Sequence, residues 1–365
     1  MSERRAAPLA EQDTSVHRGV GAQGARGMVG CWGAAAVSRA LALATIAPVW
    51  VWAMALLVLS STGCVEISAF GGARQPFEET VVFGSSGPKL LLLDVRGVIS
   101  DQEQPPPLIG PTRESTVARV REQLQRAAAA RVRGVLLRVD TPGGSAAASD
   151  LVYREVLRFK QQQRVPVVAQ FMGTATSGGY YVAMAADEIQ AYPTSITGSI
   201  GVIMLGFNFA GLMEKLGIEN QTITSGAMKD SGSPFRPMRP GERAYMQGII
   251  DEMHARFREV VARGRPALPA ERVKELSDGR VFTGARAAEL GLVDRVGTIE
   301  EAVERLEELA GVEQARVVSY HRSYEWRQNL YTRGPAAPTL KLDLSPVLGE
   351  LPRPGFHYLW LPAVD

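Results

Sequence analysis

The chain has 365 residues, of which 45% are hydrophobic, and its 40 basic residues nearly balance 38 acidic ones. This composition excludes a disordered chain and is typical of one large domain or two. The net charge of +2 gives no overall electrostatic attraction to nucleic acid, so we expect no nucleic-acid partner. The sequence contains no zinc-ligand cluster, phosphate loop or dinucleotide fingerprint, so we expect no metal and no cofactor.

The first informative segment is an uncharged, apolar run at residues 40–63. It is long enough to span a hydrocarbon core. Five arginines precede it and Glu66 follows, so the positive side is expected to stay in the cytoplasm. The sequence therefore predicts a cytoplasmic leader at residues 1–39, a membrane segment at residues 40–64, and a catalytic domain facing the periplasm or the cell exterior.

The end of this run, LSSTGCVE, also resembles a lipoprotein signal, in which a cysteine after small residues receives the lipid. Cys64 is the lipidation candidate, and an uncleaved membrane anchor is the alternative. Membrane lipid is a partner in both cases. The other cysteine, Cys31, also precedes residue 65, which excludes a disulfide framework and cysteine catalysis in the rest of the chain.

Residues 65–88 are rich in glycine and polar residues and are predicted to form a linker. From residue 89, apolar runs of strand length alternate with helical patterns, which predicts an α/β domain over residues 89–312. Its parallel sheet is expected to be covered by helices on both faces, with sites beyond the carboxyl ends of the strands. A C-terminal extension, residues 313–365, has no role that the sequence reveals. The predicted strands are residues 89–95, 134–140 and 165–171; the predicted helices are residues 113–130, 145–163, 240–263 and 298–311; and residues 193–203 are read as turn-rich.

Two glycine pairs stand where a predicted strand meets a helix, Gly143–Gly144 in DTPGGS and Gly178–Gly179 in ATSGG. Each glycine weakens a helix by about 1 kcal/mol relative to alanine, so a pair at a helix start indicates that another group approaches the backbone closely. The first amide groups of such a helix are free to bind a negative charge, as a serine nucleophile requires. Ser177 is therefore a candidate nucleophile, and a helix N-cap is the alternative interpretation.

A serine nucleophile needs a base, because its hydroxyl is too weak at neutral pH. None of the four histidines stands in a turn beside glycine or serine, so a histidine triad is unsupported. Only six of the 40 basic residues are lysines, and Lys229 lies in a loop rich in serine and glycine, SGAMKDSGSPF. Lysine, unlike arginine, can act as a base where burial keeps its amine neutral. Lys229 is thus the candidate base, and a solvated loop cation is the alternative.

Five motifs follow one another along the chain: DTPGGS, ATSGGYYVAMAADEI, TGSIGVI, SGAMKDSGSPF and GRVFTGARAAELGLVD. In this order they resemble the signal peptide peptidase A family of Ser-Lys serine peptidases, peptidase family S49. The similarity covers residues 89–309, and because the SGG and PGG motifs occur once, the chain resembles the single-repeat type. The resemblance implies a ClpP/crotonase-like spiral of β-β-α units and a homo-oligomeric ring in which neighbouring subunits complete each site.

The resemblance also implies residue roles. Ser177 is then the nucleophile, Lys229 the general base, and Ser199 the residue that orients the lysine, for which a turn residue is the alternative. The expected activity is cleavage of signal peptides left after export and of other membrane-associated peptides. The implied oxyanion hole consists of Gly143, Gly144 and Gly178.

Three other functions stay open. A crotonase-type enzyme would act on acyl thioesters, but export and the Ser/Lys pair argue against it. A catalytically silent membrane-tethered scaffold would bind peptides without cutting them, which the intact dyad disfavours. An active peptidase with another target, such as a misfolded membrane protein or a capsid scaffold, is the third, and the membrane anchor disfavours its capsid form.

Overall fold

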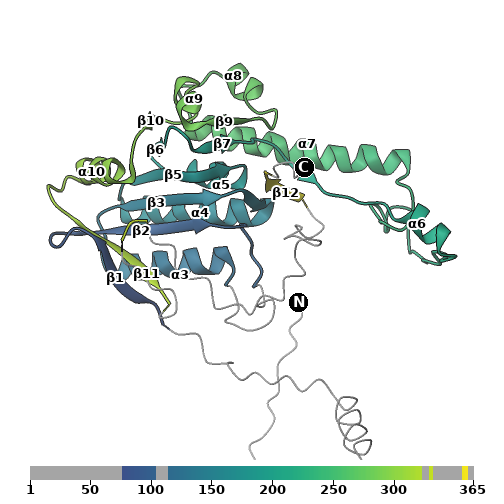
Figure 1. The fold of residues 1–365 in the computed structure, drawn as a ribbon, viewed down its shortest axis with the longest axis horizontal. Coiled ribbons are helices and arrows are strands. Elements are labelled where there is room, and N and C mark those ends of the chain that lie inside the picture. Colours follow the sequence, from purple (N-terminus) through teal and green to yellow (C-terminus); the bar gives the residue numbers. More distant parts are fainter. Residues whose placement is uncertain (1–75, 104–113, 323–328, 332–355, 361–365) are drawn as a thin grey trace, which may run out of the picture. The chain divides into compact units, whose positions relative to one another are not determined.

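The computed structural model describes residues 76–103, 114–322, 329–331 and 356–360. In these residues nine strands form one mixed sheet, and Figure 1 shows helices packed against it. The strands of this sheet are β1 (Glu78–Phe83), β2 (Lys89–Arg96), β3 (Val135–Thr141), β5 (Val167–Thr176), β6 (Glu188–Ala191), β7 (Ile196–Gly198), β9 (Val281–Thr283), β10 (Arg295–Val296) and β11 (Arg316–His321).

The centre of the sheet is parallel. The strand order is β1-β11-β2-β3-β5-β6-β10, with β7 beside β5 and β9 beside β7. β2, β3, β5 and β6 form a continuous parallel ladder, in which Leu136 of β3 pairs with Leu92 on one side and Val168 on the other. Among the described strands of this sheet, only the pairs β1–β11 and β7–β9 are antiparallel. The predicted α/β architecture with a parallel sheet is confirmed, while the ClpP/crotonase-like spiral stays a prediction.

Side chains alternate along each strand, so the two faces of the sheet carry separate hydrophobic clusters. In β2, Leu91 and Leu93 belong to one cluster, and Leu90 and Leu92 belong to the other. All four are at most 1% exposed. Burying a leucine contributes roughly 1.5–3 kcal/mol, so this one strand helps to stabilise both layers of helices.

Helices begin where side chains cap their free amide groups. The hydroxyls of Ser115 and Ser145 each accept a hydrogen bond from the backbone three residues later, and Thr298 forms a capping box with Glu301. The four predicted helices are confirmed, with boundaries that differ by a few residues at most. The helices are α3 (Thr116–Ala129), α4 (Ala146–Gln163), α5 (Gly178–Ala183), α6 (Ala210–Lys215), α7 (Pro240–Gly264), α8 (Ala270–Glu275), α9 (Gly284–Glu289) and α10 (Ile299–Ala310).

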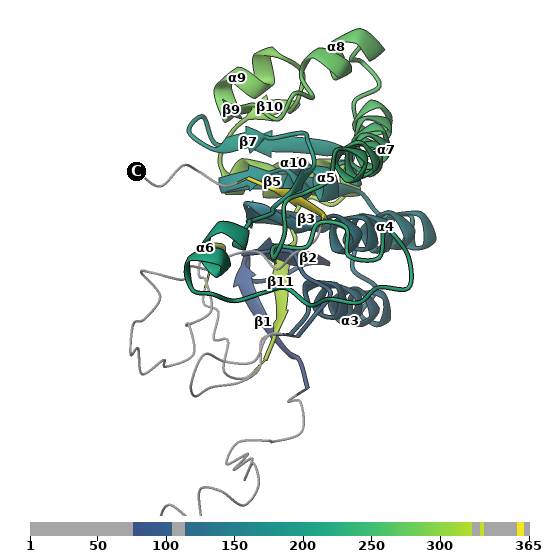
Figure 2. The ribbon, with the colours of Figure 1, turned by 90° about the vertical axis from the view of Figure 1, so that its right-hand side faces the viewer.

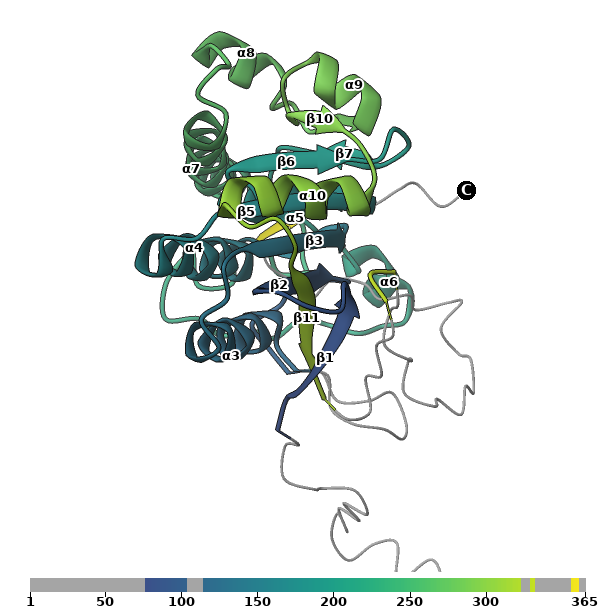
Figure 3. The same ribbon diagram turned by 90° about the vertical axis from the view of Figure 1, so that its left-hand side faces the viewer.

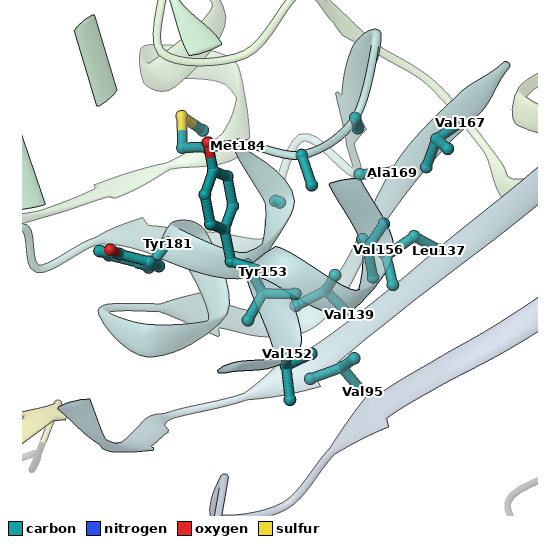
Figure 4. Packing of buried hydrophobic residues seen from close by; sticks show 14 of the residues in the cluster. Val95, Leu137, Val139, Val152, Tyr153, Val156, Val167, Ala169, Tyr181 and Met184 are labelled. Atoms are coloured by element: carbon teal, nitrogen blue, oxygen red, sulfur yellow. The ribbon is translucent and has the colours of Figure 1, made fainter. Parts of the chain in front are cut away.

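The two helical layers differ in size. α3, α4 and α5 contribute to the larger cluster, and Figure 4 shows Val152 and Val156 of α4 near Val139 of β3. The smaller cluster is closed by α10, whose Ile299 and Leu306 are fully buried. Figure 3 shows α10 lying along β3 and β5. Both faces of the central strands are therefore covered, as a parallel sheet requires.

The sheet extends beyond the limits expected from the sequence. β1 lies within the expected linker, residues 65–88, and pairs with β11, which lies in the expected C-terminal extension. Because this pairing joins segments that are far apart in the chain, no local sequence pattern predicts it. The turn-rich segment, residues 193–203, contributes β7 and a second short strand, β8 (Ile203–Met204). β8 belongs to a three-stranded sheet of order β4-β12-β8, with β4 at Gly143–Ser145 and β12 at Phe356–Leu359.

The predicted membrane segment, residues 40–64, the cytoplasmic leader and the lipidation candidate Cys64 lie outside the described residues. Within the described part of the chain, no helix has the length and apolar character needed to cross a membrane. The anchor therefore stays a prediction from the sequence.

Candidate active site

Ser177 occupies the sharp turn between β5 and α5, and its backbone is strained. Its φ of 53° and ψ of −114° lie outside the regions that residues with a side chain normally adopt. Such a conformation costs on the order of 1–3 kcal/mol and persists only where surrounding contacts enforce it. Here the Ser177 N–H donates to the carbonyl of Gly198 at 2.8 Å. A strained serine between a strand and a helix is the geometry of a nucleophile elbow.

The side chain of Ser177 does not cap the helix. α5 has no side-chain cap hydrogen bond, although Ser177 stands at the N-cap position. The residue is 1% exposed, and its Oγ has no hydrogen-bond partner among the described residues. A buried hydroxyl without a partner costs about 1–3 kcal/mol. The N-cap interpretation therefore fails, and the hydroxyl is left available for another group.

Ser199 lies next to Ser177 although 22 positions separate them in the sequence. Thr176 at the end of β5 pairs with Gly198 at the end of β7, so the residues that follow these two strands emerge together. Ser199 is 7% exposed and has a positive φ of 50°, and its N–H donates to the Arg280 carbonyl at 2.8 Å. The structure thus brings both predicted serines to one edge of the sheet.

The two glycine pairs meet at the same edge. A Cβ on Gly143 would stand 2.8 Å from the amide nitrogen of Gly178, so the turn after β3 touches the start of α5. A Cβ on Gly178 would overlap with Ser149 Oγ, and one on Gly179 would stand 2.6 Å from the Thr141 methyl group. Gly178 therefore brings two backbone segments into contact, whereas Gly179 serves the packing of α5 on β3.

The three predicted oxyanion glycines differ in what their amide groups contact. The N–H of Gly143 donates to Thr141 Oγ1 at 3.0 Å, so Gly143 contributes its φ of 100° and not a donor. Gly144 lies on strand β4 opposite Tyr358 of β12, and the Gly178 N–H is the first of helix α5, which has no partner within the helix. The oxyanion roles of Gly144 and Gly178 therefore stay predictions.

Lys229 is exposed and lies away from these residues in sequence and in contacts. It belongs to the segment between β8 and α7, residues 205–239, here called the arm. Figure 1 shows α6 and the chain around it set apart from the sheet. Because Ser177 Oγ has no partner among the described residues, no hydrogen bond joins the two members of the predicted dyad within one chain.

An ion-pair network fixes the arm next to Lys229. Arg236 donates to Asp230 Oδ2 at 2.6 Å and to Glu242 Oε2 at 2.9 Å. Glu242 is 1% exposed at the start of α7. Hydrogen bonds from Arg236 lower the pKa of both carboxyl groups, so both stay ionised at neutral pH. The arm is therefore an ordered element that presents Lys229 outward.

The arm also exposes large apolar side chains. The side chain of Ile223 is 97% exposed, and others on the arm are about half exposed or more. Many exposed apolar side chains on one segment indicate an interaction site. The exposed residues are Phe207, Phe209, Leu212, Leu216, Ile218, Ile223, Met228, Phe235 and Met238.

Comparison with known proteins identifies the family. The sequence model of peptidase family S49 matches residues 159–313. An Enterococcus faecium protein assigned as a signal peptide peptidase, SppA, is 38% identical over 263 residues, which are 69% of this chain and 72% of that protein. The chain belongs to peptidase family S49, the signal peptide peptidase A family. It is accordingly a serine protease of the signal peptide peptidase type.

Other family members match shorter parts of their own length. Protease 4 of Haemophilus influenzae is 32% identical over a region that covers 65% of this chain and 37% of that protein. A chloroplastic serine protease SPPA of Arabidopsis thaliana is 38% identical over 47% of this chain and 25% of that protein. Two solved structures of a membrane-bound stomatin-specific protease each cover 60% of this chain at a TM-score of 0.38. The first is 16% identical in sequence, and the second, which contains a substrate peptide, is 18% identical.

The sequence did not single out two further residues, His254 and Tyr181, as candidates for the site. His254 of α7 lies near the backbone of Ser277 and of Ile200, the residue after Ser199. Its Nε2 has no hydrogen-bond partner among the described residues, and burial lowers its pKa. Tyr181 of α5 is fully buried and donates to Asp150 Oδ1 at 2.6 Å. Burial is the larger cause that raises the pKa of Tyr181, and the hydrogen bond to Asp150 raises it further. The position of His254 depends on tertiary packing, so no local pattern could have found it, and Tyr181 was visible only as part of the motif that follows Ser177.

Proposed function

We propose that the protein is a membrane-anchored endopeptidase in which Ser177 of one subunit is activated by Lys229 of a second copy. The observation that carries the proposal is the strained, buried serine whose hydroxyl has no partner among the described residues. Its substrates would be signal peptides left after export and other membrane-associated peptides. The predicted segment at residues 40–64 would hold the catalytic domain near such peptides, on the periplasmic or external side.

The separation of the two dyad residues supports a second copy as the source of the base. Within a single chain, the ion pairs of Arg236 hold the arm in place, while the side chain of Lys229 stays exposed to solvent. A lysine works as a base only where it is desolvated beside the nucleophile. Docking of the apolar arm on a neighbouring subunit would supply that desolvation. In a closed ring, every arm would contact a neighbouring subunit in the same way. Ser199, adjacent to Ser177, is suited to orient the arriving amine.

The reaction follows from these positions. The unprotonated amine of Lys229 takes the proton of the Ser177 hydroxyl, and Oγ attacks the carbonyl carbon of the peptide bond. The N–H groups of Gly144 and Gly178 would hold the oxyanion, at roughly 3 kcal/mol per donor. The lysine ammonium then protonates the leaving amine. Water, deprotonated by the same lysine, releases the acyl group from Ser177.

A mixing experiment tests the shared dyad. The Ser177→Ala and Lys229→Ala variants, each inactive alone on a hydrophobic reporter peptide, are unfolded together, refolded and assayed. Random assembly places an intact serine beside an intact lysine in roughly a quarter of the sites, so activity should return to about that fraction of wild type. A mixture that stays inactive, with assembly verified by sedimentation, contradicts a dyad shared between subunits. Activity in Ser177→Ala alone would contradict the peptidase proposal as a whole and favour another nucleophile.

A further inference from the structure

Helix α5, which begins directly after Ser177, depends on contacts with the rest of the domain. It has only six residues and no side-chain cap, and a helix of this length is not stable by itself. Tyr181 lies one turn after Ser177, and its N–H donates to the Ser177 carbonyl at 2.9 Å. Figures 1 and 2 show α5 between α4 and α7. The contacts that orient α5 therefore also orient the turn that carries Ser177.

Two consecutive tyrosines attach α5 to different parts of the domain. Both are fully buried. The hydroxyl of Tyr180 donates to the Leu292 carbonyl at 2.8 Å, and the hydroxyl of Tyr181 donates to Asp150 Oδ1 of α4 at 2.6 Å. Leu292 offers a neutral acceptor, whereas Asp150 offers a carboxylate. Hydrogen bonds to ionised acceptors are roughly twice as strong as neutral ones, so we expect the Tyr181 bond to hold α5 more firmly.

Asp150 is the acceptor for three donors. Its Oδ1 also accepts a hydrogen bond from Arg256 of α7 at 3.3 Å, and its Oδ2 accepts one from Arg154, one turn further along α4. Burial would raise the pKa of this carboxyl group, but hydrogen bonds from the three donors outweigh burial and hold the pKa below its usual range. Asp150 therefore stays an anion at neutral pH and joins the three helices α4, α5 and α7.

The same turn of α4 also contacts the first residue of α5. A Cβ on Gly178 would overlap with Ser149 Oγ, so the backbone at the start of α5 lies directly against the residue before Asp150. Ser149 is fully buried, and its hydroxyl donates to the Ser145 carbonyl at 2.9 Å. Two adjacent residues of α4 thus contact α5 at points about one turn apart, which sets both the distance and the direction of the chain that leaves Ser177.

The ring of Tyr181 is enclosed by other aromatic rings. Its centroid lies 5.5 Å from that of Tyr153 and 5.0 Å from that of Phe257, both in edge-to-face contact. Figure 4 shows the rings of Tyr181 and Tyr153 beside each other. Side chains in such close packing keep one rotamer. Because the ring cannot turn, the hydrogen bond to Asp150 fixes the helix and not only the side chain.

We propose that Asp150 positions Ser177 through Tyr181, so that the serine hydroxyl faces the carbonyl carbon that it attacks. This inference rests on the proposed function, because it takes Ser177 as the nucleophile. Asp150 and Tyr181 are positioning residues in this role, since they act on the backbone that carries Ser177. A misplacement of about 1 Å can lower a reaction rate about 100-fold. Loss of the pair should therefore lower kcat and leave the binding of the peptide unchanged.

The hydroxyl of Tyr181 is tested with a matched control in the next residue. Tyr181→Phe and Tyr180→Phe each remove one buried hydroxyl and keep the ring. In the full chain, on a hydrophobic reporter peptide, Tyr181→Phe should lower kcat about tenfold with KM within about twofold of wild type. Tyr180→Phe should keep kcat within about twofold, even where urea unfolding shows a similar loss of stability. Wild-type kcat in Tyr181→Phe, or equal losses in the two variants, overturns the proposal.

Variants of Asp150 test whether Tyr181 acts through this carboxylate. Asp150→Ala should lower kcat about tenfold, and Asp150→Asn, which keeps an oxygen acceptor, should restore kcat to within about threefold of wild type. Adding Tyr181→Phe to Asp150→Ala should lower kcat by at most about threefold more, because both changes remove the same hydrogen bond. A double variant about 100-fold below wild type would show that the two residues act independently and overturns the proposal. If Asp150→Ala fails to fold, the comparison of the two Tyr→Phe variants still decides.

These measurements can fail separately from the proposed function. Activity in Ser177→Ala would reject the nucleophile and, with it, the positioning pair. Wild-type kcat in Tyr181→Phe, with Ser177→Ala inactive, would retain the peptidase and reject the pair alone. Mixing Ser177→Ala with Lys229→Ala concerns only the source of the base, because each Tyr181 variant is assayed as an assembly of identical chains.

Discussion

The turn at Ser177 and the loop at Lys229 differ in how the single chain supports them. Ser177 is 1% exposed, held by a backbone hydrogen bond to Gly198 and forced into a strained conformation. Lys229 is exposed on an arm that is ordered by ion pairs and lined with solvent-facing apolar groups. In the proposed mechanism, the comparison teaches that one chain alone builds the turn that holds Ser177, whereas Lys229 has to reach its partner through contact with a second copy.

The largest expected effect comes from removing the delivered group. Lys229→Ala should lower kcat/KM on a hydrophobic reporter peptide by about 10⁴-fold, as loss of a catalytic base does in other serine hydrolases. Lys215→Ala, which removes another exposed lysine of the arm, is the matched control and should keep wild-type activity. Similar activity of the two variants would show that Lys229 is a solvated cation. His254→Ala, assayed beside them, tests whether that half-buried imidazole serves as the base instead.

The apolar surface of the arm should be needed for assembly. Leu212→Asp combined with Leu216→Asp places two charges where we expect a subunit contact, and burying unpaired charges there is strongly unfavourable. Sedimentation should show dissociation, and activity at low protein concentration should fall about 100-fold, with the circular dichroism spectrum unchanged. Leu309→Asp changes an exposed leucine on α10 and should alter neither property. If the arm variant still assembles, the apolar surface of the arm is not required for oligomerisation.

The ion pairs of the arm predict a pH effect with a definite sign. Hydrogen bonds from Arg236 hold the pKa of Asp230 and that of Glu242 below the usual range of these carboxyl groups. Their contribution to stability is therefore present above the unfolded-state pKa and is lost as pH falls through the folded-state pKa. Arg236→Gln removes the cause, and the acid limb of activity should move to higher pH. Arg243→Gln, on an exposed position of α7, is the control. An unmoved acid limb in Arg236→Gln, with limited proteolysis unchanged, would show that the network does not hold the arm.

The smallest effect concerns the strain at Ser177. Glycine adopts this backbone conformation readily, so Ser177→Gly should raise the free energy of unfolding by about 1 kcal/mol while abolishing activity. Urea unfolding measures the change. Ser145→Gly alters a serine with a φ of −57° that caps α4, and it should destabilise the protein. A loss of stability in Ser177→Gly would mean that the turn is not strained.

Local patterns were sufficient for the elements that flank the site. The apolar run of β2, the helices α4 and α10 and the glycine pairs depend on residues that are neighbours in the chain, and the structure has them where they were expected. The sequence was wrong about the reach of the sheet, because β1 lies in the expected linker. The sequence also placed Gly143 in the oxyanion hole but could not show that the Gly143 N–H donates to Thr141 Oγ1.

By itself, the sequence determined that a serine, two glycine pairs and a lysine would stand in turns and loops of an α/β fold. It did so because strand, helix and turn preferences act over a few residues. Only the tertiary structure decided that Ser177 is strained and without a side-chain partner among the described residues, that Lys229 faces outward, and that β12 lies against Gly144. These features arise from pairing between segments far apart in the chain, where packing and main-chain hydrogen bonds outweigh local preference.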